Sequence, residues 1–389
     1  MCIRDRHQIP EAIASFEQAL AIKGGIAGAE KADTERRLVI LRDGGKLDLT
    51  AIEQQLKNSP KDVVLMVLKA KNLAAAGRPQ DAAAAYQETL AVNPEIEVAH
   101  LGLAELYTTA LNQPDKALLA ANQARKVAPQ SPRAAAVLGT TNFRCGKHEE
   151  AYTMLLEAAR KLPAEPTVQA DYAWAAYSMG HVAEARATMD KLAANDPTQA
   201  AAAKDFLVLT DPTAADNAAT PALVEKKLAA SPTDVPALMA RAALQEKAGA
   251  SPVASYAKVL EIFPQFDLAR IALARIYLDD PTQLEAAEKL ANAARERSKN
   301  DPGLSGVLAI INFRKGQFDY AAQLLMELSA KRPLTGGELF ALGISQAATQ
   351  RADNARQTLT QALLTKLPEA DDAKAKATLA ELDKPDGGK

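Results

Sequence analysis

Prolines recur along the first half of the chain at a nearly constant spacing. Pro60, Pro94, Pro129, Pro163 and Pro197 follow one another at a spacing of about 34 residues, and each closes an Ala-rich run of helical character. A fixed period of this length is typical of repeat architectures, in which each repeat buries its apolar face only against its neighbours. The chain of 389 residues is therefore expected to be a repeat array and not one globular core.

Glycine and alanine recur in phase with the prolines. Glycine stands about half a period before a proline, always at the same distance, at Gly77, Gly146, Gly180 and Gly316. Alanine stands at a second fixed distance, closer to the proline, at Ala82, Ala117, Ala151, Ala185 and Ala321. We expect each glycine to form the turn between two helices, and each alanine to allow the second helix to cross the first closely. Unrelated helical bundles give no reason for this shared phase.

A second set of positions identifies a family resemblance. Four residues after the crossing alanines stand Tyr86, Ala121, Leu155, Met189 and Leu325. The pattern resembles the Ala-x3-Phe…Pro signature of the tetratricopeptide repeat family, whose Leu-Gly element is matched at Leu138-Gly139 and Leu342-Gly343 and whose aromatic position is matched at Tyr107. The resemblance implies an all-α fold, a right-handed superhelical solenoid of stacked helix-turn-helix repeats.

A longer period is superposed on the repeats. The segment Asn142–Lys147 reappears five periods later as Asn312–Gln317, and Ser59–Val63 recurs as Ser231–Val235. We interpret the chain as two continuous copies of a five-repeat unit, in which the irregular stretch Thr210–Ala222 is a long loop inside a repeat. The expected divisions are 7–178 for the first unit, 179–368 for the second, and 369–389 for a capping helix and a disordered tail.

The N-terminal residues do not complete a repeat. His7 to Leu20 reads as a second helix, with Ala12 and Phe16 at the crossing positions, but residues 1–6 cannot supply its first helix. We expect residues 1–6 to be a scar or a truncation remnant. A signal peptide, a lipid anchor or an enzyme domain upstream therefore stays open, and so does the compartment, either the cytoplasm or a bacterial cell envelope or periplasm.

Composition excludes several partner classes. Lys and Arg total 46 against 48 Asp and Glu, so no overall field draws the chain to nucleic acid, and none is expected as a partner. The longest apolar stretch, Val63–Leu68, is far shorter than the roughly 20 residues of a membrane-spanning helix. Cys145 lies beside Arg144 and Lys147, which would lower its pKa, but its counterpart in the second copy is Lys315.

Motifs for catalysis or cofactor binding are absent from the sequence. The four histidines, at His7, His100, His148 and His181, show no metal-ligand spacing, and the chain holds no nucleotide-binding glycine motif and no GxSxG. We therefore predict no catalytic residue, no cofactor and no metal site.

The family resemblance implies binding of a protein or peptide in a concave groove lined by the first helix of each repeat. The positions expected to face the groove are Lys71, Glu105, Thr109, Thr140, Arg144, Asp171, Trp174 and Tyr177. Clamping of a C-terminal carboxylate is disfavoured, because the matching places hold Val64, Val67, Leu68, Leu101 and Gly102. Trp174 could instead pack against the adjoining repeat.

Three functions are compatible with such a chain. The first is a bacterial-type protein-interaction scaffold without intrinsic catalysis. The second is the substrate-recruiting array of a larger enzyme, such as a glycosyltransferase. The third is a ligand-sensing regulator, which would need a fused effector domain. The oligomeric state and the identity of the partner are open.

Overall fold

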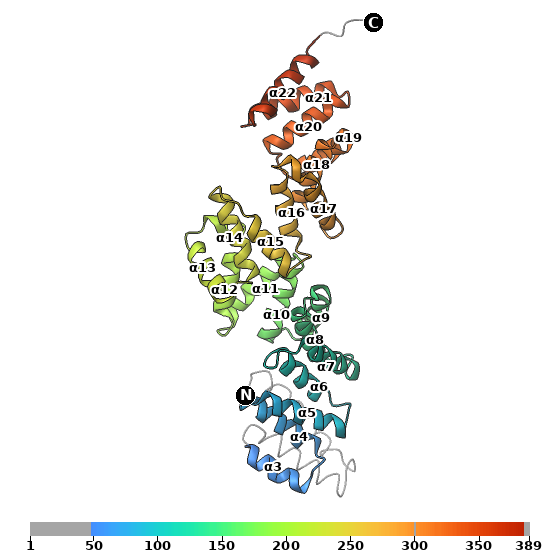
Figure 1. Cartoon of the computed structure of the whole chain (residues 1–389), viewed down its shortest axis with the longest axis vertical. Coiled ribbons are helices and arrows are strands. Elements are labelled where there is room, and N and C mark those ends of the chain that lie inside the picture. Colours follow the sequence, from blue (N-terminus) through green and yellow to red (C-terminus); the bar gives the residue numbers. More distant parts are fainter. Residues whose placement is uncertain (1–47, 299–300, 385–389) are drawn as a thin grey trace. The chain divides into compact units, whose positions relative to one another are not determined.

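The computed structural model describes residues 48–298 and 301–384, and all regular structure in this part is helical (Figure 1). The chain divides into two compact units, one of the residues up to Tyr177 with His181–Lys204 and the other of Ser178–Gly180 with the residues from Asp205 onward. The main boundary between these units lies between Lys204 and Asp205, inside a helix, and so follows the boundary expected for the sequence duplication, between residues 178 and 179. The duplication is a likeness in sequence, whereas the units are defined by how residues contact one another in the fold.

The described helices of the first unit alternate between first and second helices of successive hairpins. They are α3 (Leu49–Asn58), α4 (Val63–Ala75), α5 (Pro79–Val92), α6 (Glu97–Thr108), α7 (Pro114–Val127), α8 (Pro132–Arg144), α9 (His148–Lys161), α10 (Pro166–Ser178) and α11 (Val182–Asn195). Helix α12 (Ala200–Leu209) contains the boundary between the units.

The second unit continues the alternation to the C-terminal end of the described chain. Its helices are α13 (Thr220–Ala230), α14 (Val235–Lys247), α15 (Val253–Ile262), α16 (Asp267–Tyr277), α17 (Leu284–Arg295), α18 (Pro302–Arg314), α19 (Phe318–Ser329), α20 (Gly336–Ala348), α21 (Ala352–Leu363) and α22 (Glu369–Leu382), with short 3-10 helices at η2 (Ala214–Asp216) and η3 (Pro281–Gln283).

Successive hairpins pack on one another. Helices α4 and α5, α6 and α7, and α8 and α9 form hairpins, and α5 contacts α6 while α7 contacts α8. The same order holds from α14 to α21. The predicted all-α solenoid of helix-turn-helix repeats is confirmed.

The turns inside the hairpins require a left-handed backbone. Gly77, Gly146, Gly180 and Gly316 have φ between +73° and +81°, as expected, and Gly249 has φ +69°. At the first of these turns the amide of Arg78 donates to the carbonyl of Leu73 at 2.9 Å, closing a six-residue Schellman bond. Glycine adopts this conformation without the steric cost that a Cβ would add.

Prolines mark the ends and the beginnings of helices. Pro60, Pro94, Pro129, Pro163 and Pro197 each lie two residues after the last residue of a helix, which confirms their predicted role. Other prolines occupy the first turn of a helix, where the missing amide hydrogen leaves no bond unmade. These include Pro79, Pro114, Pro132, Pro221, Pro236 and Pro302.

The crossings of first and second helices are as tight as the sequence predicts. Ala82, Ala117, Ala151, Ala185 and Ala321 are each at most 1% exposed. On the opposing helix, a Cβ added to Gly139 would lie 2.6 Å from Cγ of Leu155, and a Cβ on Gly343 would lie 2.6 Å from Cγ of Leu359. At these crossings a leucine of the second helix packs directly against a glycine of the first helix.

Several finer expectations can be compared with the structure. The irregular loop ends earlier than expected, because α13 already begins at Thr220, where Pro221 suits the first helical turn. Helix α22 lies where a capping helix is expected, packs on α20 and α21 and buries Ala375. The expectations for residues 1–6 and for His7 to Leu20 lie outside the described residues, as does the tail from residue 385. No helix in the described part is long and apolar enough to cross a membrane.

The crossing at Gly139 generates a stability prediction. Gly139→Ala places a methyl group against Leu155, including its backbone nitrogen at 3.1 Å, so we expect a loss of about 1–3 kcal/mol of unfolding free energy. Gly337→Ala is the matched control, since no atom lies within 4 Å of its added Cβ and alanine favours helix. Urea denaturation followed by circular dichroism measures both. Equal stability of the two variants would contradict the tight crossing.

Candidate partner-binding site

Four of the predicted groove residues occupy one equivalent position on successive first helices. Lys71, Thr140 and Trp174 each lie six residues before the turn glycine of their hairpin, on α4, α8 and α10. Glu105 occupies the same place on α6, directly after buried Ala104, where the following turn is one residue longer. Helix α4 contacts α6, and α6 contacts α8. We name these four residues the groove row.

The predicted site residues differ in their accessibility. Glu105, Thr109 and Arg144 are exposed, whereas Lys71, Thr140, Asp171 and Trp174 are half-buried. Thr109 caps α6 and its hydroxyl donates to the carbonyl of Glu105 at 2.7 Å, so it contributes to the helix end as well as to the surface.

One side-chain hydrogen bond joins two first helices across repeats. The hydroxyl of Thr140 on α8 donates to Oδ2 of Asp171 on α10 at 2.8 Å, and it also lies 3.0 Å from the carbonyl oxygen of Ala136. A carboxylate has about four acceptor sites, so Asp171 can still accept hydrogen bonds from a bound segment. The contact therefore helps to orient the carboxylate of Asp171.

Trp174 and Tyr177 form an edge-to-face pair with ring centroids 6.5 Å apart and an interplanar angle of 88°. The two rings differ in exposure, because Tyr177 is only 3% exposed while Trp174 is half-buried. An edge-to-face arrangement restricts the orientation of the tryptophan ring. Tyr177 therefore supports Trp174, which is the ring of the pair with accessible area.

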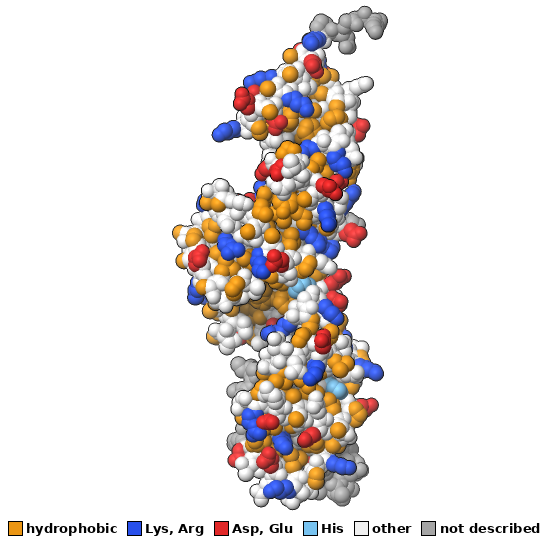
Figure 2. All heavy atoms as spheres, in the orientation of Figure 1, with side chains coloured by type: hydrophobic (Ala, Val, Ile, Leu, Met, Phe, Trp, Pro, Cys, Tyr) orange, Lys and Arg blue, Asp and Glu red, His pale blue; other side chains and the backbone are white. Residues whose placement is uncertain are grey.

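The charges around the groove row are of both signs. Lys71 and Arg144 are cationic, and Glu105 and Asp171 are anionic. The face drawn in Figure 2 likewise shows acidic and basic side chains interspersed with hydrophobic ones. Such a surface suits a partner of mixed charge. Among the described residues no three His, Cys, Asp or Glu side chains are grouped where they could hold a metal ion.

A polar cluster in the first unit was not anticipated from the sequence. Glu184 on α11 accepts hydrogen bonds from the hydroxyls of Tyr172 on α10 and Tyr152 on α9, the latter at 3.1 Å. Its Oε2 also lies 3.3 Å from Nδ1 of His181. The rings of Tyr152 and Tyr172 stack with centroids 6.1 Å apart. The cluster ties three helices together.

The cluster shifts the pKa values of its members. Burial raises the pKa of Tyr172, and its hydrogen bond to Glu184 raises it further, since the neutral hydroxyl is the donor. Burial alone would raise the pKa of Glu184, but the hydrogen bonds from Tyr172, Tyr152 and His181 outweigh it, and the pKa of this carboxyl is lowered.

A sequence signal for this cluster exists. Tyr172 lies eight residues before its turn glycine, Gly180, where other hairpins carry a buried leucine, as at Leu138 and Leu308. A polar ring at a leucine position requires a partner when buried, and Glu184 supplies it.

The pKa of the Cys145 thiol also departs from expectation. The pKa of Cys145 was expected to be lowered by Arg144 and Lys147, but burial raises it, Lys147 lowers it less, and Asp115 on α7 raises it. The expectation was wrong because it ignored desolvation and the adjoining hairpin. His148 begins α9, is 8% exposed, and meets the ring edge of Phe143 with centroids 5.2 Å apart.

Comparisons with known proteins agree with this geometry. A family model described as "Tetratricopeptide repeat" matches residues 73–139 and 144–207. No curated protein matches the sequence. A chain from the crystal structure of the APC/C hetero-tetramer Cut9-Hcn1 is similar over 97% of this chain and 87% of its own, with 13% identity and a TM-score of 0.50, which shows a shared fold.

Two smaller structures are similar to about half of this chain. The crystal structure of YrrB, titled a TPR protein with an unusual peptide-binding site, is 17% identical over 49% of this chain and 97% of its own, with a TM-score of 0.39. A thermophilic TPR protein in Thermus thermophilus is 20% identical over 50% of this chain and 98% of its own, with a TM-score of 0.36.

The cluster around Glu184 predicts a pH dependence of stability. The pKa of Glu184 is lower in the folded chain than the ordinary value of 4.5, so its stabilising contribution is present above that pH and is lost as the pH falls through the folded pKa. Glu184→Gln should lower stability at neutral pH and reduce the loss of stability between about pH 5 and pH 3. Urea midpoints measured across this range give the comparison.

The matched control is Glu150→Gln, an exposed carboxylate on α9 that makes no ion pair within the described part of the chain. Glu150→Gln should lose as much stability as the wild type when the pH falls from about 5 to about 3. An equal loss of stability in Glu184→Gln and the wild type over this range would contradict the prediction.

Proposed function

Because the chain is a tetratricopeptide-repeat protein, we propose that it is a scaffold that binds another protein, as an extended peptide or a helix, along the groove row of its first unit. The observation that carries the proposal is the recurrence of partly accessible, chemically varied side chains at one position of successive first helices. A ligand laid across these helices would meet one such side chain per repeat.

The side chains of the groove row and the predicted site residues beside it supply complementary kinds of contact. Trp174 offers the largest apolar area, with Tyr177 fixing its ring. Asp171, held by Thr140, would accept hydrogen bonds from the bound segment, and Lys71, Glu105 and Arg144 would set its orientation by charge. Interface hot spots are enriched in Trp, Tyr and Arg, which supports Trp174 as the principal anchor. Thr109 would border the surface at the end of α6.

This function requires no catalytic group, cofactor or metal in the chain. Family similarity favours binding over catalysis, because stacked repeats of this kind form extended binding surfaces. The mixed charge of the groove row favours a protein over a polyanion, since nucleic acid binding depends on a basic surface.

The test is selective capture by the full chain, followed by binding to the purified partner. Wild type and Leu119→Ala should capture the same protein, because Leu119 is 64% exposed on the second helix α7, away from the groove row. Trp174→Ala should lose that protein, with binding weakened by roughly 2 kcal/mol or more, as for hot-spot residues. Arg144→Ala should chiefly slow association and reduce its dependence on salt.

Folding is measured in the same variants by thermal melting. A Trp174→Ala protein that melts much earlier than the wild type and yet binds the purified partner normally would make Trp174 a core residue. The assignment of the groove row would then have to be abandoned. Normal melting with lost binding supports the proposal.

A further inference from the structure

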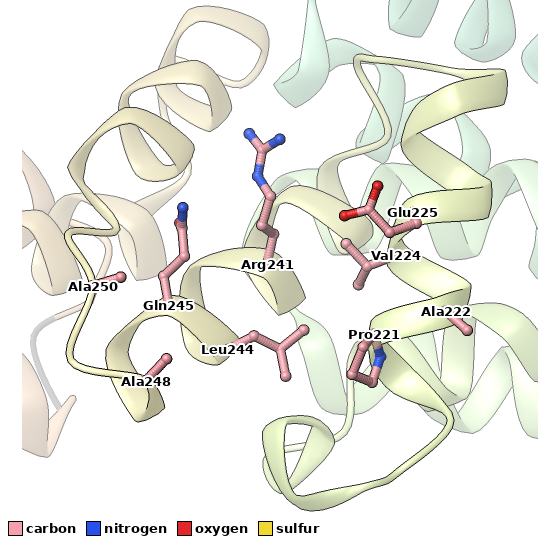
Figure 3. A pocket seen from close by; sticks show the side chains of 9 residues that line it. All are labelled: Pro221, Ala222, Val224, Glu225, Arg241, Leu244, Gln245, Ala248 and Ala250. Carbon is pink, nitrogen blue, oxygen red and sulfur yellow. The ribbon is translucent and has the colours of Figure 1, made fainter.

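A cavity of about 470 Å³ opens in the second unit between α13 and α14. Figure 3 shows its two walls: Arg241, Leu244 and Gln245 project from α14, and Pro221, Val224 and Glu225 lie opposite on α13. The side chains of Arg241 and Glu225 reach toward the same rim, above an apolar floor that Leu244, Val224 and Pro221 form. The volume is within the range of roughly 300–1,000 Å³ that is common for ligand sites.

One wall of the cavity carries a charged residue at a position that is apolar in several other hairpins. Arg241 lies eight residues before the turn residue Gly249. At the same distance from the turn, the hairpins of α8, α18 and α20 carry Leu138, Leu308 and Leu342, which are 6–8% exposed. A leucine there packs against the preceding hairpin, whereas the guanidinium of Arg241 points to the rim.

A polar relay holds Arg241 by one edge only. Its Nε donates to Oγ of Ser255 on α15 at 3.0 Å, and that hydroxyl donates to Oε1 of Gln245 at 2.7 Å. Ser255 is 1% exposed, so the relay is anchored in the core. Within the described part of the chain, the two terminal nitrogens of Arg241 make no hydrogen bond, and together they form the fork that matches a carboxylate.

The opposite wall carries an acid whose counterpart in the first unit is paired. With the register of Ser59–Val63 on Ser231–Val235, Glu225 corresponds to Glu53 and Arg241 to Lys69. Lys69 Nζ lies 4.0 Å from Oε1 of Glu53. Glu225 makes no ion pair or hydrogen bond with any described residue, although Arg241 lines the same cavity.

The relay explains the difference between the two units. The counterpart of Gln245 in the first unit is Leu73, a buried apolar side chain that cannot orient a cation. In the second unit, the hydrogen bonds from Arg241 to Ser255 and from Ser255 to Gln245 hold the guanidinium of Arg241 away from Glu225. Both charges then face the cavity with unused hydrogen-bonding capacity.

We propose that this cavity binds a peptide segment of a partner that presents a carboxylate to Arg241, an apolar side chain to the floor at Leu244 and Val224, and a cationic group to Glu225. The terminal nitrogens of Arg241 bind the carboxylate in a bidentate manner, and the amide nitrogen of Gln245 adds a donor beside them. The inference goes beyond the proposed function, since it concerns the second unit and does not depend on the groove row.

The experiment titrates the full chain, labelled at Leu and Val methyl groups, with the peptide Ac-Glu-Leu-Lys-NH2 and observes the NMR signals of Leu244 and Val224. We expect saturable shifts of both signals. Replacing the acid of the peptide, in Ac-Gln-Leu-Lys-NH2, or the base of the cavity, in Arg241→Gln, should weaken binding about tenfold, which corresponds to about 1.4 kcal/mol.

Matched variants separate the site from general charge effects. Lys69→Gln removes the equivalent base of the first unit and should leave the titration unchanged, while Ser255→Ala should weaken binding by releasing Arg241. If Arg241→Gln fails to fold, Glu225→Gln replaces it, because Glu225 is exposed and should remain folded. Glu225→Gln should remove the preference for Ac-Glu-Leu-Lys-NH2 over Ac-Glu-Leu-Gln-NH2.

Three results would overturn the inference. One is the absence of saturable methyl shifts at millimolar peptide, and another is equal affinity for the Glu and Gln peptides. The third is an unchanged titration in both cavity variants. None of these results bears on capture of a partner by the groove row, so failure of this inference and failure of the proposed function are distinguishable.

Discussion

The close crossing of two helices in each hairpin is the constraint on which the rest of the structure depends. At Gly139 the first helix has no side chain, and Leu155 of the second helix fills that space. Ala151, which is 0% exposed, keeps the other side of the crossing equally narrow. Because helices this short are marginal alone, each crossing must be completed by contacts with the neighbouring hairpin. The first helices are thereby held at a regular spacing, and residues six before the turn form a row.

The same regularity means that chemistry can change at one position without changing the fold. Eight residues before the turn, Leu138 is a core residue, Tyr172 donates a hydrogen bond to Glu184, and Arg241 lines a cavity. A leucine at this place contributes apolar burial, whereas each polar replacement needs a hydrogen-bonding partner. Tyr172 finds its partner within its own unit. Arg241 finds one for a single edge, so its other edge remains available to a ligand.

Features that depend on one residue and its place along the chain could be predicted from the sequence. The turn at Gly146, the crossing at Ala151 and the helix end before Pro163 follow from backbone conformation and side-chain volume alone. The burial of Tyr177 and the raised pKa of Cys145 could not, because both depend on what the adjoining hairpin places against them. In a repeat array the period is local, whereas the surroundings of each side chain are set by the neighbouring hairpin.

The two copies of the acid–base pair show how small a difference separates a closed surface from an open site. Lysine carries one compact charge on a flexible stem, and the ammonium group of Lys69 lies near Glu53. Arginine carries a planar group with several donors in a fixed fork. Nε of Arg241 can therefore donate to Ser255 while its two terminal nitrogens face the cavity. An exposed ion pair contributes little stability, so loss of the pairing with Glu225 costs the fold little. The buried hydroxyl of Ser255 then decides where the guanidinium points.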